Sequence, residues 1–356
     1  MDESSTYEPS LFSFKLPEEL SAKEPPERRG IARDQVKLMI ISRVDGKVSH
    51  SRFNHLGEFL KKDDLLVFNS SRTLPASLKG CGAPTGPCIE VRLAQHLPDD
   101  TWLALLICQR GDPFTCGLRA GMTIDFGHDL LAEVEKTDDR IPRLWKLQFS
   151  QKGAALIDLI YRIGQPIRYE YISSPWDLDY YQTVYAKEPG SAEMPSAGRA
   201  FTWKMLFDLK RQGIDSAYLT LHTSLSSYMD DLFYREHPAS EEEYFISKAT
   251  ADKINLARKN NGRVIAVGTT VVRALESAAK DNDIIEPGHN YTRLHITGSH
   301  PLQAVDGLLT GLHEPEASHL DLLNAFLTVE QISTAYEEAI NLGYLWHEFG
   351  DLNLIL

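Results

Sequence analysis

The sequence predicts a mixed α/β body interrupted by an inserted small β-barrel. The length of 356 residues suggests two domains. From Leu65 to about Phe149, short strand-like runs alternate with turn residues, which is typical of a small barrel. After Gly153 the pattern changes to alternating helices and strands. We therefore expect an α/β main domain made of residues 1–62 and 152–356, and an inserted β-barrel domain of residues 63–151.

The first 151 residues comprise an arm and the predicted barrel. Residues 1–35 are rich in Glu, Pro and Arg and predict an extended arm, in which Phe12, Phe14 and Leu16 alternate as in a short strand. Clusters of Gly, Pro and Asp separate the apolar runs that follow. The barrel strands are expected at residues 65–68, 89–93, 102–107 and 144–149.

The remaining elements follow from periodicity and from cap residues. Residues 154–163 predict an apolar helix that ends at Gly164. Thr202 is the expected N-cap of a second helix, and Thr328 with Gln331 forms a capping box for a third. Residues 218–221 and 263–267 predict buried strands, and residues 251–260 a helix between them.

Composition limits the classes of protein that the chain can belong to. A net charge of −13 disfavours broad contact with phosphate backbones, although a local basic surface would still permit a nucleic-acid partner. No apolar run is long enough to span a membrane, and the acidic start lacks the features of a signal peptide, so we expect a cytoplasmic location. The four cysteines lie within 36 residues; we interpret them as reduced thiols packed in strands, with a zinc or redox site as the alternative.

The sharpest local motif runs from Val264 to Glu276. A buried strand leads into Gly268, then Thr269 and Thr270, and then a helix that carries Arg273. This order places free backbone N–H groups and the positive end of a helix dipole beside a ligand, which suits a carboxylate or ribose hydroxyls. The alternative is a plain strand-to-helix turn in which one threonine is the N-cap.

Two neighbouring segments carry a second set of candidates. Aromatic, amide and hydroxyl side chains alternate over residues 180–185, a pattern that can stack on a base and bind its edge. An ordinary β-segment followed by a capped helix explains the same residues. Gly198 precedes that helix and allows either the close approach of a ligand or a tight turn.

Histidines near strand ends are candidate acid–base groups. His222 follows the strand at residues 218–221, and Glu236 with His237 can supply acid and base near neutral pH. His313 and His319 flank glutamates, but not with the spacing of a zinc protease. The glycine-rich signatures of dinucleotide-binding and P-loop folds, and the nucleophile elbow of hydrolases, are absent from the sequence.

These segments, taken in order, resemble the S-adenosylmethionine:tRNA ribosyltransferase-isomerases of queuosine synthesis over some 340 residues. Each matching piece is short, and the resemblance lies in their colinearity. The pieces are Phe12–Leu20, Asp64–Asn69, Arg72, Pro75–Ala76, Glu90, Tyr181–Ala186, Ala197–Gly198, Phe201–Thr202, Leu221–His222, Glu236–His237, Gly262–Thr270, Val272–Arg273, Leu275–Ser277, Val305–Asp306, Leu309–Thr310, His313, Pro315, Ala325–Phe326 and Phe349–Asp351.

The resemblance implies an α/β body with an inserted barrel, and a reaction in which S-adenosylmethionine donates its ribosyl group to 7-aminomethyl-7-deazaguanine in tRNA. Rearrangement to an epoxycyclopentane then releases adenine and methionine. This chemistry needs a base beside the sulfonium, an acid for adenine, and a nucleobase held by stacking. It implies S-adenosylmethionine as co-substrate, no permanently bound cofactor or metal, tRNA as partner, no membrane contact and a monomer.

The resemblance also assigns roles to individual residues. The implied catalytic residues are His222, Glu236, His237, Asp306 and His313. Those expected to bind S-adenosylmethionine are Gly268, Thr269, Thr270, Arg273 and Glu276. Those expected to bind the acceptor are Asn69, Arg72, Tyr181, Gln182, Thr183, Tyr185, Gly198 and Phe201.

Several positions depart from the family motifs. Ser70 replaces an aspartate, Ala200 a histidine, Met229 an arginine and Ser240 a second histidine, and the segment at 311–318 differs around Ala317. Added glutamates nearby would repel a phosphate backbone. A divergent paralogue that uses S-adenosylmethionine with another acceptor, and a non-catalytic binding protein, are therefore the alternatives to the family reaction.

Overall fold

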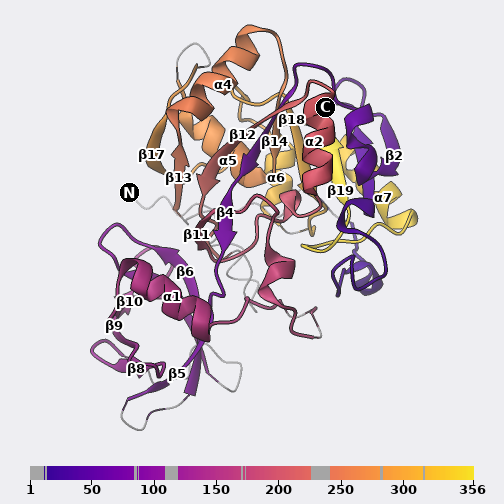
Figure 1. Cartoon of the computed structure of the whole chain (residues 1–356). Coiled ribbons are helices and arrows are strands. Elements are labelled where there is room, and N and C mark those ends of the chain that lie inside the picture. Colours follow the sequence, from indigo (N-terminus) through magenta and orange to yellow (C-terminus); the bar gives the residue numbers. More distant parts are fainter. Residues whose placement is uncertain are drawn as a thin grey trace, which may run out of the picture.

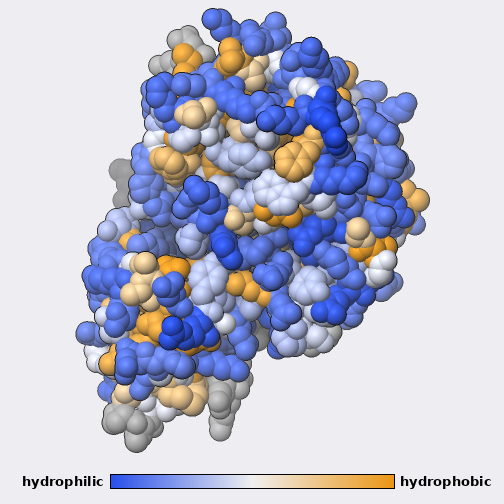
Figure 2. All heavy atoms as spheres, viewed as in Figure 1, coloured by the Kyte–Doolittle hydropathy of each residue, from blue (hydrophilic) through white to orange (hydrophobic). Residues whose placement is uncertain are grey.

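A computed structural model describes residue 12 and residues 14–83, 86, 88–108, 119–169, 171–172, 174–225, 241–280, 284–315 and 317–356. These residues form an α/β body and a closed barrel that projects from it (Figure 1). The predicted fold class is confirmed. On the face shown in Figure 2, hydrophilic side chains predominate and hydrophobic ones occur in small groups.

Nine strands within the described residues make the sheet of the body. Four neighbouring strands at its centre, β12, β3, β14 and β18, are parallel. The residues of β3, β14 and β18 are almost entirely buried, as expected when helices cover both faces of a parallel sheet. The strand order is β17 (Gly288–Thr292), β13 (Glu242–Ile246), β12 (Asp215–Leu221), β3 (Leu65–Asn69), β14 (Val264–Val267), β18 (Gly307–Gly311), β19 (Leu352–Ile355), β1 (Lys37–Ile41) and β2 (Val48–Arg52).

Each face of this sheet has its own core, because alternate side chains of a strand point to opposite faces. Leu65 and Val67 pack with α4 (Lys248–Lys259), α5 (Thr269–Ala278), α6 (His319–Leu323) and α7 (Val329–Asn341). Leu66 and Phe68 pack with α2 (Trp203–Arg211) and the 3₁₀ helix η3 (Phe53–Glu58). The central strands are thereby fixed from both sides, which holds their carboxyl ends in place.

The closed barrel has the order β10-β7-β6-β5-β8-β9 and a core separate from that of the body. Helix α1 (Gly153–Ile163) packs Leu156 and Ile160 against this core, so it belongs with the barrel by contact. The strands are β5 (Ser77–Gly82), β6 (Cys88–His96), β7 (Trp102–Cys108), β8 (Thr123–Asp125), β9 (Leu131–Thr137) and β10 (Leu144–Phe149).

The remaining elements of the described residues are short. Strand β4 (Ser71–Thr73) pairs with β11 (Glu188–Ser191) just outside the body sheet. The others are the 3₁₀ helices η1 (Glu18–Leu20), η2 (Arg33–Gln35), η4 (Leu178–Tyr181) and η5 (Ser196–Gly198), and the small hairpin of β15 (Ala279–Lys280) and β16 (Ile284–Ile285).

The structure differs from expectation at the start of the barrel. Residues 65–68, predicted to be barrel strand, form β3 between β12 and β14, and the first barrel strand begins at Ser77. A boundary at residue 63 is therefore too early. Four consecutive apolar residues suit a strand buried on both faces better than a barrel strand with one solvated face. The N-terminal strand predicted around Phe14 is also wrong, since Phe14 lies outside any strand and packs on Tyr336 with ring centroids 5.3 Å apart.

Cap predictions are confirmed, whereas the cysteine interpretation is not. Thr202 accepts from the Met205 N–H at 3.2 Å, and Thr328 with Gln331 forms the expected capping box. Cys81 and Cys88 form a disulfide rather than two thiols, because the antiparallel register of β5 and β6 places them opposite each other with Cα atoms 4.0 Å apart. Cys116 lies outside the described residues. None of the helices in the described ranges is long and apolar enough to cross a membrane.

Candidate active site

A cavity of about 250 Å³ lies at the carboxyl ends of the central parallel strands. Open α/β sheets commonly bind ligands at this edge. One wall consists of strand ends and the start of α5, and we call it the sheet-edge wall. The opposite wall consists of Pro166, Ile167, Tyr169, Tyr171, residues 192–197 and residues 347–348, and we call it the loop wall. Polar groups that line the cavity include Glu193, Thr223, Ser224, Glu242, Thr269, Thr270, Arg273, Thr310, His313, Glu314, His319, His347 and Glu348.

Gly268 connects β14 to α5 beside the cavity. It is the N-cap residue of α5 and has a φ of +98°. An added Cβ would lie 3.4 Å from the Ala197 Cβ, and an L-residue would be strained at this φ. No described side chain caps this helix, so the alternative of a threonine N-cap is wrong. Thr269 and Thr270 instead line the cavity beside the positive end of the α5 dipole.

Asn69, at the end of β3, links the strand ends beside the cavity by hydrogen bonds. Its amide donates to the Leu221 carbonyl at 2.8 Å and accepts from the Leu221 N–H at 3.0 Å. The same amide nitrogen lies 3.4 Å from the Thr270 hydroxyl. Asn69 therefore joins β3, β12 and α5 and positions Thr270 without lining the cavity itself.

Arg273 occupies the next turn of α5 and is engaged within the protein. It forms an ion pair with Glu242, which is 3% exposed, and donates to the Leu294 carbonyl at 3.0 Å. Glu242 also accepts from the Ser224 N–H at 3.1 Å. Because its charge is matched by Glu242, Arg273 offers hydrogen bonds to a ligand rather than an uncompensated positive charge.

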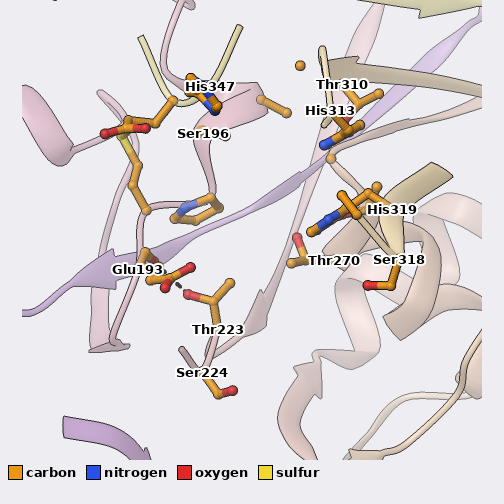
Figure 3. A pocket seen from close by; sticks show the side chains of 18 of the residues that line it. Glu193, Ser196, Thr223, Ser224, Thr270, Thr310, His313, Ser318, His319 and His347 are labelled. Atoms are coloured by element: carbon orange, nitrogen blue, oxygen red, sulfur yellow. Dashed lines mark hydrogen bonds between the residues drawn. The ribbon is translucent and has the colours of Figure 1, made fainter. Parts of the chain in front are cut away.

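His313 and His319 stack on each other with ring centroids 4.6 Å apart and an interplanar angle of 4° (Figure 3). The Thr310 hydroxyl lies 3.0 Å from the His313 Nε2. Burial, reinforced by the neighbouring His319 and His347, holds the pKa of His313 well below its usual value. His313 is thus neutral at pH 7, and it is suited to hydrogen bonding rather than to holding a positive charge.

The loop wall carries a stack of aromatic rings. Tyr169 and Tyr171 are parallel, with centroids 5.5 Å apart, and His347 lies on Tyr171 at 4.0 Å. Burial lowers the pKa of His347 to about 4, so this ring is neutral at pH 7. A planar nucleobase is the kind of ligand that such rings accept.

Glu348 is a carboxyl group of the loop wall with a strongly shifted pKa. Its Oε2 accepts a hydrogen bond from the Tyr171 hydroxyl, whereas its buried Oε1 has no hydrogen-bond partner among the described residues. Burial raises the pKa of Glu348 to about 7, against the lowering effect of the Tyr171 hydrogen bond, and the charge of Glu193 raises it further. The carboxyl can therefore gain or lose a proton near neutral pH.

The structure brings six sequence-predicted residues to the cavity: Gly268, Thr269, Thr270, Arg273, Tyr181 and His313. Other candidates act in the scaffold. Gln182 binds both the N–H and the carbonyl of Thr73, at 3.1 and 2.8 Å. Gly198 is required because a Cβ there would lie 1.8 Å from the Tyr185 hydroxyl. Buried with their side chains in the body are Thr183, Tyr185 and Phe201, and no strand forms over residues 181–185.

Four further candidates lie away from the cavity lining. His222 is half-buried beside Ser71, with its Nδ1 2.7 Å from the Ser71 hydroxyl. Glu276 accepts from the N–H groups of residues 303 and 304 and fixes that loop. Asp306 accepts from the Val264 N–H at 2.8 Å, at the start of β14 and hence at the opposite edge of the sheet. Arg72 is exposed and lies over the Tyr161 ring.

Some positions fall outside the described residues, namely Glu236 and His237 together with the departures at Met229 and Ser240. Of the other departures, Ser70 donates to the Leu219 carbonyl at 3.0 Å, and Ala317 lines the cavity. Ala200 lines a small separate void behind the loop wall.

Sequence reasoning missed the groups of the loop wall: Tyr169, Tyr171, Glu193, His347 and Glu348. Two signals were present, the Tyr-x-Tyr spacing at 169–171 and the position of His347 and Glu348 immediately before the matched tail at Phe349. Neither signal shows that these segments, far apart in sequence, meet. No group of His, Cys, Asp and Glu residues able to hold a metal ion occurs among the described residues.

Comparisons with known proteins agree over nearly the whole chain. A family model described as "Queuosine biosynthesis protein" matches residues 9–355. Proteins named S-adenosylmethionine:tRNA ribosyltransferase-isomerase are similar, one from Caldanaerobacter subterraneus at 35% identity (98% of this chain, 99% of the relative) and one from Aquifex aeolicus at 36% (97% and 98%). The crystal structure of an S-adenosylmethionine tRNA ribosyltransferase from Thermotoga maritima matches with a TM-score of 0.54 and 28% identity, covering 97% of this chain and 99% of that one.

Proposed function

The chain belongs to the queuosine biosynthesis protein family, and we propose that it is an S-adenosylmethionine:tRNA ribosyltransferase-isomerase. In this function it transfers and isomerises the ribosyl group of S-adenosylmethionine onto 7-aminomethyl-7-deazaguanine in tRNA. The observation that carries the proposal is the pairing of two unlike walls around one cavity. A helix N-terminus with two threonines faces a stack of tyrosine and histidine rings.

The sheet-edge wall suits S-adenosylmethionine. Ribose hydroxyls and a carboxylate are ligands for the first turn of α5, where Thr269 and Thr270 stand beside the helix dipole. Arg273, held by Glu242, adds a donor one turn further along. The sulfonium carries the positive charge that acidifies the neighbouring ribosyl carbon, so the protein has to supply a proton acceptor and an ordered site.

The loop wall suits the acceptor base. Tyr169 and Tyr171 present parallel aromatic surfaces next to the cavity. A base withdrawn from the anticodon stack loses stacking energy, and contact with aromatic rings replaces part of it, on the order of 1–3 kcal/mol per base. Neutral His313 and His347 add no positive charge of their own to the cavity.

The test is the release of adenine and methionine from S-adenosylmethionine by the purified protein, in the presence of tRNA that carries the precursor base. The Aquifex aeolicus relative is assayed in parallel as a positive control. We expect release that depends on both substrates. Failure of this protein to turn over, while the relative is active in the same mixture, contradicts the proposal.

A second candidate is transfer from S-adenosylmethionine to a different acceptor. It is favoured by the charge of the lining, in which Glu193, Glu242, Glu314 and Glu348 stand against Arg273. A lining rich in carboxylates attracts cations and repels a phosphate backbone. Calorimetry separates the candidates: binding of both S-adenosylmethionine and tRNA supports the first, and binding of S-adenosylmethionine alone supports the second.

A further inference from the structure

Glu348 is the one residue of the loop wall that combines an ionisable group with an oxygen lacking a protein partner among the described residues. A carboxyl oxygen buried without a hydrogen bond is costly, and such sites are retained where function needs them. The Tyr171 hydroxyl holds the other oxygen, so the side chain has a fixed orientation. The side chain lines the cavity, and although Oε1 itself is buried, no described protein group occupies its hydrogen-bonding position.

A small void adjoins Glu348 at the position where the chain departs from its family motif. Ala200 stands where that motif has a histidine, and it lines the void with Ser196, Arg199, His347 and Glu348. Residue 200 supplies no imidazole to this void, but His347 supplies an imidazole and Glu348 a carboxyl. This arrangement indicates that acid–base capacity is present here but is carried by residues 347 and 348.

We propose that Glu348 is the base that takes a proton from the ribosyl carbon bonded to the sulfonium sulfur, with Tyr171 as its positioning residue. The C–H bond breaks, its electron pair stays on the carbon beside the positive sulfur, and a new O–H bond forms on the Glu348 carboxylate. The carboxylate becomes a neutral carboxyl, so the total charge of the site is conserved. This assignment rests on the proposed function.

The charged and titratable groups around Glu348 set its proton affinity. Tyr171 and Arg199 lower the pKa of the carboxyl, and Glu193 raises it, while burial raises it most and brings it to about 7. Tyr181 and His347 also line the cavity, and the Glu314 Oε1 lies 3.6 Å from the His347 Nδ1. Arg199 is matched by Glu27 at 2.9 Å, so its charge reaches Glu348 partly neutralised.

The first experiment measures adenine release by the Glu348→Gln variant, which keeps the shape of the side chain and an acceptor oxygen for Tyr171. We expect a loss of at least about 100-fold in rate, with the affinity for S-adenosylmethionine changed less than about threefold. Glu338→Gln, on the exposed side of α7, is the matched control and retains the wild-type rate. A Glu348→Gln rate within tenfold of wild type overturns the proposal.

The second experiment uses the pH profile of the same reaction, and a purely structural role would leave this profile unchanged. Wild type should lose activity as pH falls through about 7, because the base becomes protonated. Tyr171→Phe removes a donor to the carboxylate and should move this midpoint to higher pH. Glu193→Gln removes a like charge and should move it to lower pH. Coincident midpoints in all three proteins overturn the proposal.

A third measurement separates failure of this inference from failure of the proposed function. If wild type releases no adenine, the proposed function falls, and ¹³C NMR of labelled glutamate carboxyls then tests the site directly. We expect one signal that titrates near pH 7, is missing from Glu348→Gln and shifts when S-adenosylmethionine is added. The absence of such a signal overturns the inference.

Discussion

The two walls of the cavity differ in how their polar groups are satisfied. On the sheet-edge wall, Thr270, Arg273 and His313 are each held by hydrogen bonds to neighbouring protein groups. On the loop wall, Glu348 keeps one oxygen without a partner among the described residues, and its pKa is raised by burial. The site therefore joins a binding surface whose polar groups are hydrogen-bonded within the protein to a surface where a buried carboxyl can exchange a proton. Substitutions should therefore weaken the protein at the first wall and relieve it at the second.

The largest expected effect is at the sheet-edge wall. Arg273→Ala should lower the free energy of unfolding by about 3–5 kcal/mol, because it leaves Glu242 buried without its cation. Denaturant unfolding at pH 7 measures the change. The double variant Arg273→Ala/Glu242→Gln removes the stranded charge and should recover part of the loss. Equal destabilisation of both variants would show that the charge is not the cause.

At the loop wall, we expect a substitution to raise the free energy of unfolding rather than to lower it. The pKa of Glu348 is raised from 4.5 to about 7, so its contribution to stability is present below pH 4.5 and is lost as pH rises through 7. Relative to wild type, Glu348→Gln should gain about 2–3 kcal/mol in unfolding free energy between pH 5 and pH 8. Paired denaturation curves at the two pH values give this number. If the difference in unfolding free energy between the variant and wild type stays constant with pH, Glu348 ionises with an ordinary pKa.

His347, next in the chain, has the opposite pH dependence. Its pKa is lowered from 6.5 to about 4, so the stability that it contributes is present above pH 6.5 and is lost as pH falls toward 4. His347→Phe keeps a ring on Tyr171 and removes the titration. Between pH 8 and pH 5 the variant should lose about 2 kcal/mol less than wild type. Parallel pH dependences of the two unfolding free energies would contradict this assignment.

The smallest effect expected is at the turn that opens the sheet-edge wall. Gly268→Ala should cost about 1 kcal/mol, because φ is +98° and the new Cβ lies 3.4 Å from Ala197. It should also weaken S-adenosylmethionine binding, since the turn positions Thr269 and Thr270. Thermal unfolding and calorimetry measure the two effects. Gly121→Ala, also at positive φ but with open space around it, is the control for backbone strain alone.

Local patterns in the sequence were enough to predict much of the fold. The capping box at Thr328 and the cap at Thr202 formed as expected, because these bonds join residues three apart. The turn at Gly268 was found for a similar reason: a buried strand, a glycine and a helix start are contiguous. Six candidates derived from the motifs line the cavity.

Predictions that depended on distant partners were less successful. Residues 65–68 were predicted to be barrel strand, yet β3 pairs with β12 and β14, about 150 and 200 residues further along the chain. Gly198 gave no sign that it makes room for the Tyr185 hydroxyl. Glu276 and Asp306 lie in matching motifs, but they bind backbone N–H groups elsewhere in the body.

The sequence by itself determined the α/β body, the inserted barrel, the helix caps and the glycine turn at the sheet edge. Each of these depends on short-range geometry or on the period of apolar residues. Only the tertiary structure decided which polar groups face the cavity and that Tyr171 meets His347 and Glu348. That contact closes a loop of more than 170 residues, and the burial that shifts the pKa of Glu348 exists only after the chain has folded around it.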